Sequence, residues 1–167
     1  MKNLDCIELI STKTVKNFTL PVSLKNCNLS AVLKHFGLSQ ADAVVTHLGR
    51  KNVEVAYWEI NIETKNKTVL KIWAADNRIV KIDLVKTFSN TEKVEDMLQQ
   101  LPKANTKLSY YYGVINLEEK ALIYPEKGIA FFLGFTKGVI NYISYFQPTT
   151  IANYINTLHP TKAPREF

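Results

Sequence analysis

The chain has 167 residues, of which 46% are hydrophobic, 11% aromatic and 22% charged, and its formal net charge is +6. This apolar content is typical of a folded protein and excludes intrinsic disorder, while six glycines and six prolines exclude collagen-like and low-complexity classes. The length fits one domain, or two small halves packed as one, with a core that needs neither disulfides nor a structural metal.

The N-terminal segment 1–24 predicts two short extended stretches, at 6–10 and 18–22, with Pro21 placing the second at the edge or end of a sheet. Asp5 and Glu8 interrupt the apolar residues of the start, so no secretory signal is predicted. No apolar stretch is long enough to cross a bilayer. If Met1 is the natural start, these features indicate a cytoplasmic protein.

The first helix is predicted from an apolar face formed by Leu29, Val32, Leu33 and Phe36, at helical spacing. Asn28 is the expected N-cap, and Gly37 the expected stop. A second short helix is predicted over residues 39–48, ending at Gly49.

Three strands are then predicted, over residues 53–63, 68–74 and 79–85, separated by turns at 65–67 and 76–78. The first of them alternates in polarity, which places Trp58, Ile60 and Ile62 on one face of the sheet and Tyr57, Glu59, Asn61 and Glu63 on the other.

The second half of the sequence follows the same order. A second helix face, formed by Val94, Met97, Leu98 and Leu101, has the same internal spacing as that of the first helix. Strands are predicted at 108–115, 121–124, 128–135 and 139–146. A C-terminal helix is predicted over 149–158, capped by Thr149 or Thr150.

This repeated order predicts an α+β fold with two similar halves, each a helix or helices followed by an antiparallel β-meander, packed as one compact unit over residues 1–167. The internal repeat would comprise residues 25–86 and 88–148. In the last strand of each half, Ile140, Ile143 and Tyr145 repeat the spacing of Ile79, Ile82 and Leu84.

One segment of the second half carries a resemblance to a known fold. The sequence reads YPEKGIAF at 124–131 and GVINYISYFQP at 138–148. It is similar to the helix-plus-meander modules of the β-lactamase-inhibitor-protein-like fold. The outer-membrane-assembly lipoproteins of the SmpA/OmlA type are built in a similar way. The similarity covers 88–148 well and 25–85 loosely. It implies a small binding unit without a catalytic site, in which tandem modules present a concave sheet to a protein partner. This chain differs from the proteins of that fold that act in the cell envelope, because no secretion or lipoprotein signal is predicted for it.

No residue pattern indicates catalysis, a cofactor or a metal. His35, His47 and His159 are far apart in the sequence and have no residues at metal-ligand spacing around them. Cys6 and Cys27 match no metal-ligand spacing either, and we expect both to be buried thiols. The segment 134–138, with a glycine at each end, lies between two predicted strands, which indicates a hairpin turn rather than a phosphate loop. We therefore expect a protein that is not an enzyme.

The aromatic residues are the candidate site. Strand parity places Lys71, Trp73, Lys81 and Asp83 on the same face as Tyr57. The six aromatic residues predicted for this face, as a partner-binding surface, are Tyr57, Trp73, Tyr111, Phe132, Tyr142 and Phe146. An equally weighted interpretation is that the N-terminal strands, the C-terminal helix or a second copy of the chain covers them.

These expectations favour a non-catalytic protein-binding module, immunity-like or inhibitor-like, with a protein partner or a second copy as ligand. Nucleic-acid binding is the alternative, because residues 1–86 hold 13 Lys and Arg against 8 Asp and Glu, while 87–167 hold 8 against 7. The basic residues are mostly scattered singly, which is typical of an ordinary solvated surface.

Overall fold

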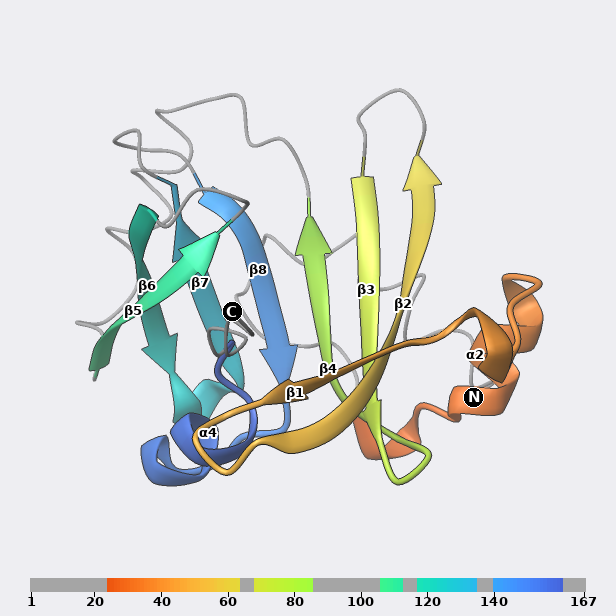
Figure 1. Ribbon diagram of the computed structural model, residues 1–167, viewed down its shortest axis with the longest axis horizontal. Helices are drawn as coiled ribbons and strands as arrows, with labels where there is room; N and C mark the ends of the chain where they lie inside the picture. Colours follow the sequence, from red (N-terminus) through yellow and green to blue (C-terminus); the bar gives the residue numbers. More distant parts are fainter. Residues whose placement is uncertain (1–23, 64–67, 86–105, 113–116, 135–139, 161–167) are drawn as a thin grey trace, which may run out of the picture.

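The computed structural model describes residues 24–63, 68–85, 106–112, 117–134 and 140–160. The fold they form is α+β, with one antiparallel sheet and two α-helices (Figure 1). The helices are α2 (Leu29–His35) and α4 (Ile151–Thr157), and short 3-10 helices are η1 (Leu24–Asn26), η2 (Gln40–Asp42) and η3 (Pro125–Lys127). The strands are β1 (Val44–Leu48), β2 (Val53–Glu63), β3 (Thr68–Ala75), β4 (Arg78–Val85), β5 (Thr106–Tyr112), β6 (Leu117–Tyr124), β7 (Ile129–Leu133) and β8 (Ile140–Phe146).

The sheet joins two four-stranded meanders in the order β1-β2-β3-β4-β8-β7-β6-β5. The last strand of each meander lies at the centre, where β4 and β8 pair antiparallel, with Asp83 opposite Ser144. The predicted helix around Val94 and Leu101, like the extended segments before residue 24, lies outside the described residues. The relation between the two halves therefore stays a prediction.

The first meander follows the polarity of its sequence. Trp58 and Ile60 point to the α2 side of the sheet and are buried there, as their alternation predicts. Asp76 and Asn77 have positive φ values of 49° and 60°, which are typical of the tight hairpin turn predicted between β3 and β4. The first helix also begins as predicted, because the Asn28 side chain accepts a hydrogen bond from the Ala31 amide at 2.9 Å.

The helix predicted over residues 39–48 is wrong. Only Gln40–Asp42 is helical, and the chain then forms β1. Ser39 and Asp42 make a capping box, so the segment does start like a helix. The consecutive β-branched residues Val44, Val45 and Thr46 favour an extended conformation, and pairing with β2 supplies their backbone hydrogen bonds.

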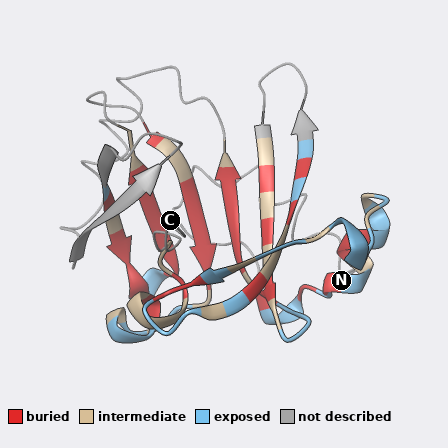
Figure 2. Ribbon diagram, in the orientation of Figure 1, coloured by how far each residue is buried: buried red, intermediate tan, exposed pale blue. Residues whose placement is uncertain are grey.

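Two apolar clusters cover the two faces of the sheet. The larger one packs η1 and α2 against the sheet and includes Cys27, which is buried as predicted. The smaller one packs α4 against the other face, over β6, β7 and β8. Buried residues run along the central strands, whereas the turns and the outer surfaces of the helices are exposed (Figure 2).

The C-terminal helix also contacts the first meander. β2 sweeps across the lower part of Figure 1, which brings the β1–β2 turn beside α4. In that turn the amides of Gly49, Arg50 and Lys51 donate hydrogen bonds to the carbonyl oxygens of His159, Ile155 and Asn156, at 2.9, 3.0 and 3.1 Å. The carbonyls of Ile155 and Asn156 belong to the last turn of α4, and that of His159 follows the helix. Carbonyls at a helix end lack acceptor bonds within the helix, so the turn satisfies them. The sheet is therefore fastened at this point by contacts far apart in sequence.

The remaining strand predictions agree with the structure apart from their ends, and β5 begins earlier than the predicted 108–115, whose last three residues lie outside the described ranges. The C-terminal helix is capped by Thr150, whose hydroxyl accepts a hydrogen bond from the Asn153 amide at 3.1 Å. β7 and β8, the strands on either side of the glycine-containing segment 134–138, pair antiparallel, while residues 135–138 of the predicted turn lie outside the described residues. No helix among the described residues has the length and apolar character to span a membrane.

Candidate functional site

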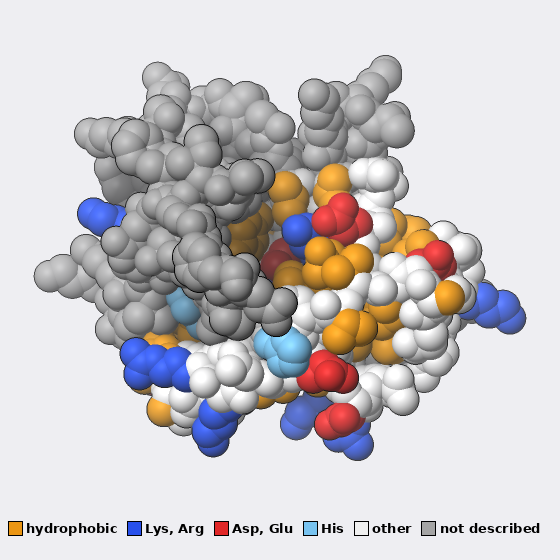
Figure 3. Space-filling model, in the orientation of Figure 1, with side chains coloured by type: hydrophobic (Ala, Val, Ile, Leu, Met, Phe, Trp, Pro, Cys, Tyr) orange, Lys and Arg blue, Asp and Glu red, His pale blue; other side chains and the backbone are white. Residues whose placement is uncertain are grey.

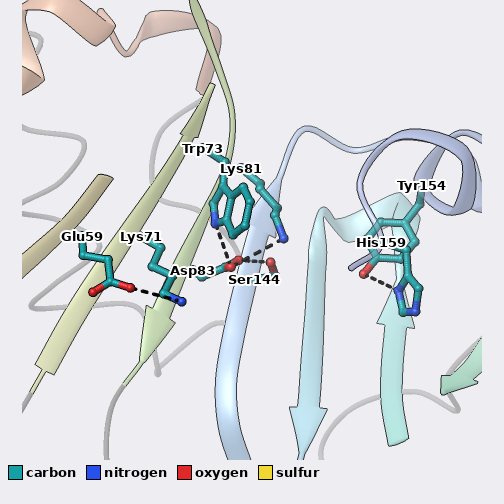
Figure 4. A network of polar contacts seen from close by, with 8 residues as sticks. All are labelled: Glu59, Lys71, Trp73, Lys81, Asp83, Ser144, Tyr154 and His159. Atoms are coloured by element: carbon teal, nitrogen blue, oxygen red, sulfur yellow. Dashed lines mark hydrogen bonds and ion pairs between the residues drawn. The ribbon is translucent and has the colours of Figure 1, made fainter. Parts of the chain in front are cut away.

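The face of the sheet opposite α2 carries a group of aromatic and charged side chains, called here the Trp73 cluster. The strand register brings them together, because Tyr57 lies opposite Trp73, and Lys81 lies opposite Trp73 on the other side. Its members are Tyr57, Glu59, Lys71, Trp73, Lys81 and Asp83 from β2, β3 and β4, and Ser144 from β8. Figure 4 shows all of them except Tyr57. The parity of the sequence predicted the first six of these positions on one face.

The centre of the cluster is a buried ion pair. Lys81 and Asp83 are only 1% and 3% exposed, and 3.5 Å separates the Lys81 Nζ from an Asp83 carboxylate oxygen. Burial lowers the pKa of the Lys81 ammonium below its ordinary value, while Asp83 opposes this effect. Two charges in a dry site are stable only when further hydrogen bonds satisfy them.

Asp83 receives those hydrogen bonds. The Trp73 indole Nε1 donates to Asp83 Oδ2 at 2.9 Å, and the Ser144 hydroxyl donates to Asp83 Oδ1. Both carboxylate oxygens are thus engaged, one of them across the junction between the two meanders. Asp83 therefore links Trp73 and Lys81 of the first meander to Ser144 of the second.

The aromatic members are stacked between the lysines. Lys81 Nζ lies 4.5 Å from the Trp73 ring centroid, and the Tyr57 and Trp73 rings are 4.6 Å apart at an interplanar angle of 34°. Lys71 Nζ lies 5.4 Å from the Tyr57 ring centroid and 3.4 Å from a Glu59 carboxylate oxygen. Cation–π contacts and stacking therefore fix both rings from more than one side.

The cluster is half open. Tyr57, Lys71 and Trp73 are half-buried and Glu59 is exposed, in contrast to the ion pair beneath them. On the described part of the face turned to the viewer in Figure 3, hydrophobic side chains lie beside both acidic and basic ones, with no broad area of one charge sign.

The six predicted aromatic residues divide into three groups. Tyr57 and Trp73 lie together in the Trp73 cluster. Phe132 and Phe146 are 0% and 1% exposed, so the expectation that they lie on an open surface is wrong. The reason is α4: Phe146 packs against Tyr154 with ring centroids 5.0 Å apart.

The other two aromatic residues are not members of the Trp73 cluster. Tyr142 is half-buried and stacks on Phe132, with centroids 4.2 Å apart and an interplanar angle of 10°. Tyr111 lies in β5 with its backbone opposite Glu118, and its side chain lies outside the part of the structure that is described. The sequence did not decide whether the C-terminal helix covers this face. In the structure α4 covers it over β7 and β8.

Sequence reasoning missed a second polar pair beside α4. The Tyr154 hydroxyl lies 3.2 Å from His159 Nδ1, and burial raises the Tyr154 pKa well above its ordinary value, with the negative charge of Asp83 adding to the rise. Their close spacing at the end of a predicted helix was the available signal. His35 and His47 are exposed, on α2 and β1.

A separate pocket of about 230 Å³ lies between the β1–β2 pair, the β3–β4 turn and the start of α2. Val45, Trp58 and Ala74 contribute to its apolar lining, and Glu54 and Asp76 are its charged residues. None of the residues that line it is a histidine, cysteine or serine. Elsewhere in the described ranges, no three His, Cys, Asp or Glu side chains are grouped as metal ligands would be.

No family model, curated protein or solved structure matches this chain.

Proposed function

We propose that the protein is a non-catalytic protein-binding module, of an immunity or inhibitor type, and that Tyr57 and Trp73 are its principal contacts with the partner. The observation that carries the proposal is the half-open aromatic pair held above a buried ion pair whose carboxylate is hydrogen-bonded. Tyrosine and tryptophan are enriched among the residues that contribute most to protein–protein binding.

The rigidity of the pair supports this role. Trp73 is fixed by its hydrogen bond to Asp83, by Lys81 and by Tyr57. A ring already held in one orientation loses little conformational entropy on binding, so more of its contact energy appears as affinity. The indole N–H already has its acceptor inside the protein, so the ring offers a partner mainly apolar contact.

The charges favour a protein partner over nucleic acid. Lys71 is paired with Glu59, and Lys81 is buried and paired with Asp83. Binding to single-stranded nucleic acid needs aromatic platforms together with cations directed at phosphates. Both lysines of this face are instead engaged with carboxylates of the same chain.

We also propose that the two meanders are related halves, as in the tandem helix-plus-meander modules of the β-lactamase-inhibitor-protein-like fold. The alignment of the halves that equates Ile82 with Ile143 also equates Asp83 with Ser144. These last two residues lie opposite each other in β4 and β8. A two-fold relation between the halves would pass through this pair, which supports the repeat.

The test is capture of a partner from the source lysate by tagged wild-type protein and by the variants Tyr57→Ala and Trp73→Phe. Phe36→Ala is the matched control, because Phe36 packs on the α2 side of the sheet. We expect a protein that stays bound in about 0.5 M salt, where charge contacts are screened, and that is lost with Tyr57→Ala but retained with Phe36→Ala.

Thermal unfolding of each variant would verify that it is folded. A partner that binds Tyr57→Ala and Trp73→Phe as well as wild type would contradict the proposed site. Nucleic acid recovered only at low salt would favour the alternative function.

A further inference from the structure

A second surface stands out at the edge of the sheet, away from the Trp73 cluster. Val44 and Val45 in β1 are 49% and 62% exposed, and they are the exposed large hydrophobic residues among the described part of the chain. Successive residues of a strand point to opposite faces of the sheet. Exposure of both valines therefore shows that neither face of the sheet is covered at this point of β1.

β1 is the first strand of the sheet, so one of its sides has no strand neighbour within the described residues. The far end of that side is occupied, because Leu48 forms an isolated antiparallel bridge with Pro160. The open run is Val44–His47, and it contains no lysine, proline or glycine. Lysine and proline on an edge strand commonly prevent it from pairing with another chain, and the run has neither.

The charges at the two ends of β1 have opposite signs. Asp42 is exposed just before the strand, and Arg50 and Lys51 are exposed just after it. In an antiparallel pairing of two copies, the start of each strand meets the end of the other, so both acidic ends lie next to basic ends. A parallel pairing would bring like charges together. Glu54 lies on β2, one strand further from the edge.

We propose that β1 pairs antiparallel with β1 of a second copy of this chain, across a two-fold axis at the run Val44–His47. The pairing buries Val44 and Val45 of both copies and extends the sheet through the dimer. The interface is isologous, because the same strand contributes both sides. The contact is short, so the dimer is weak and forms at high protein concentration.

The test is the monomer–dimer equilibrium of the full chain, measured by sedimentation over a wide range of concentration. Val45→Lys places like charges close together across the two-fold axis, and we expect it to raise the dimer dissociation constant by at least about tenfold. Ala152→Lys adds the same charge on the exposed side of α4 and serves as the control. A wild type that stays monomeric, or a dimer insensitive to Val45→Lys, would overturn the proposal.

Charge reversal gives a second, independent measurement. Arg50→Glu combined with Lys51→Glu should weaken the dimer, and adding Asp42→Lys should restore it, because the complementary ends are then exchanged. Exchange of those amides in Val44–His47 that point away from β2 should slow as the dimer fraction rises. Slow exchange at these amides that is independent of concentration would show that something other than a second copy covers the edge, and would refute the pairing.

Discussion

At the scale of single residues, the two members of the buried ion pair differ in the contacts that they make with other groups. Asp83 accepts hydrogen bonds from Trp73 and Ser144 in addition to its contact with Lys81, whereas Lys81 has Asp83 as its nearest described carboxylate and the Trp73 ring as a further contact. Removing the carboxylate leaves a buried cation and two unpaired donors, and removing the cation leaves a carboxylate that keeps two donors.

We therefore expect Asp83→Ala to lower the free energy of unfolding by about 3–5 kcal/mol and Lys81→Met by only about 1–2 kcal/mol. Urea unfolding of the two variants beside wild type measures both values. Equal losses would show that the two charges depend on each other alone and that the hydrogen bonds to Asp83 add nothing.

The buried Tyr154 predicts a specific response to alkaline pH. Its pKa is raised in the folded protein, so above the ordinary tyrosine value of 10.0 the unfolded chain loses a proton that the folded protein retains. Stability should then fall with rising pH, by up to about 1.4 kcal/mol per pH unit.

Tyr154→Phe removes the effect of Tyr154 ionisation on stability and keeps every other titrating group. The stability difference between wild type and Tyr154→Phe should be constant below pH 10 and should shrink above it. A difference that does not change with pH would mean that the Tyr154 hydroxyl is not buried.

The extent to which the sequence predicts the site follows from the range of the interactions. Alternation along β2, β3 and β4 is local, so it placed Tyr57, Trp73 and Asp83 on one face without a structure. That the Lys81–Asp83 pair is buried depends on β8, which brings Ser144 to Asp83 from the other half of the chain. No local pattern reports which strands will be neighbours, and the same limitation left the burial of Phe146 beneath α4 open.

At the scale of elements, the contact between the β1–β2 turn and α4 depends on a glycine. Gly49 has a φ of +72°, and a Cβ added to it would overlap the carbonyl oxygen of Asn156. Gly37 offers a matched comparison, because its φ is +68° but a Cβ there would meet nothing within 4 Å.

Gly37→Ala should cost about 1 kcal/mol, from the left-handed backbone conformation alone. Gly49→Ala should cost at least about 3 kcal/mol, because the turn must also move away from α4 and lose its hydrogen bonds. Thermal or chemical unfolding of the two variants compares them directly, and similar losses would show that the turn tolerates displacement from the helix.

Which helices and strands could be predicted from the sequence depends on whether local patterns or distant contacts decide their structure. β2 was predicted to the residue because its polarity alternates along the strand. The segment 39–48 was predicted wrongly because Ser39 and Asp42 begin as a helix does, whereas the pairing of Val44–Leu48 with β2 decides the outcome. A contact with a distant strand outweighed a local preference there.

At the scale of the whole molecule, α4 connects the two meanders. It covers Phe132 and Phe146 of the second meander and accepts hydrogen bonds from the β1–β2 turn of the first. A chain that ends before Thr149 would expose the smaller apolar cluster and release that turn.

We expect this truncated chain to lose cooperative thermal unfolding and to bind a hydrophobic dye, as loosely packed states do. Leu158→Ala, which trims the same cluster but keeps the helix, should remain cooperative with a lowered melting temperature. A truncated chain that melts close to wild type would show that the sheet is stable without α4.

The position of the charged pair on β4 has a consequence for the nascent chain. β8 leaves the ribosome about 60 residues after β4, which at about 5–20 residues per second is a delay of roughly 3–12 s. During that interval β4 presents Lys81 and Asp83 on an edge that has no partner yet. If two nascent chains joined through β4 in the register that β8 later adopts, two carboxylates would meet where Asp83 now meets Ser144. The carboxylate that links the two meanders in the finished sheet would thus also disfavour this mispairing during synthesis.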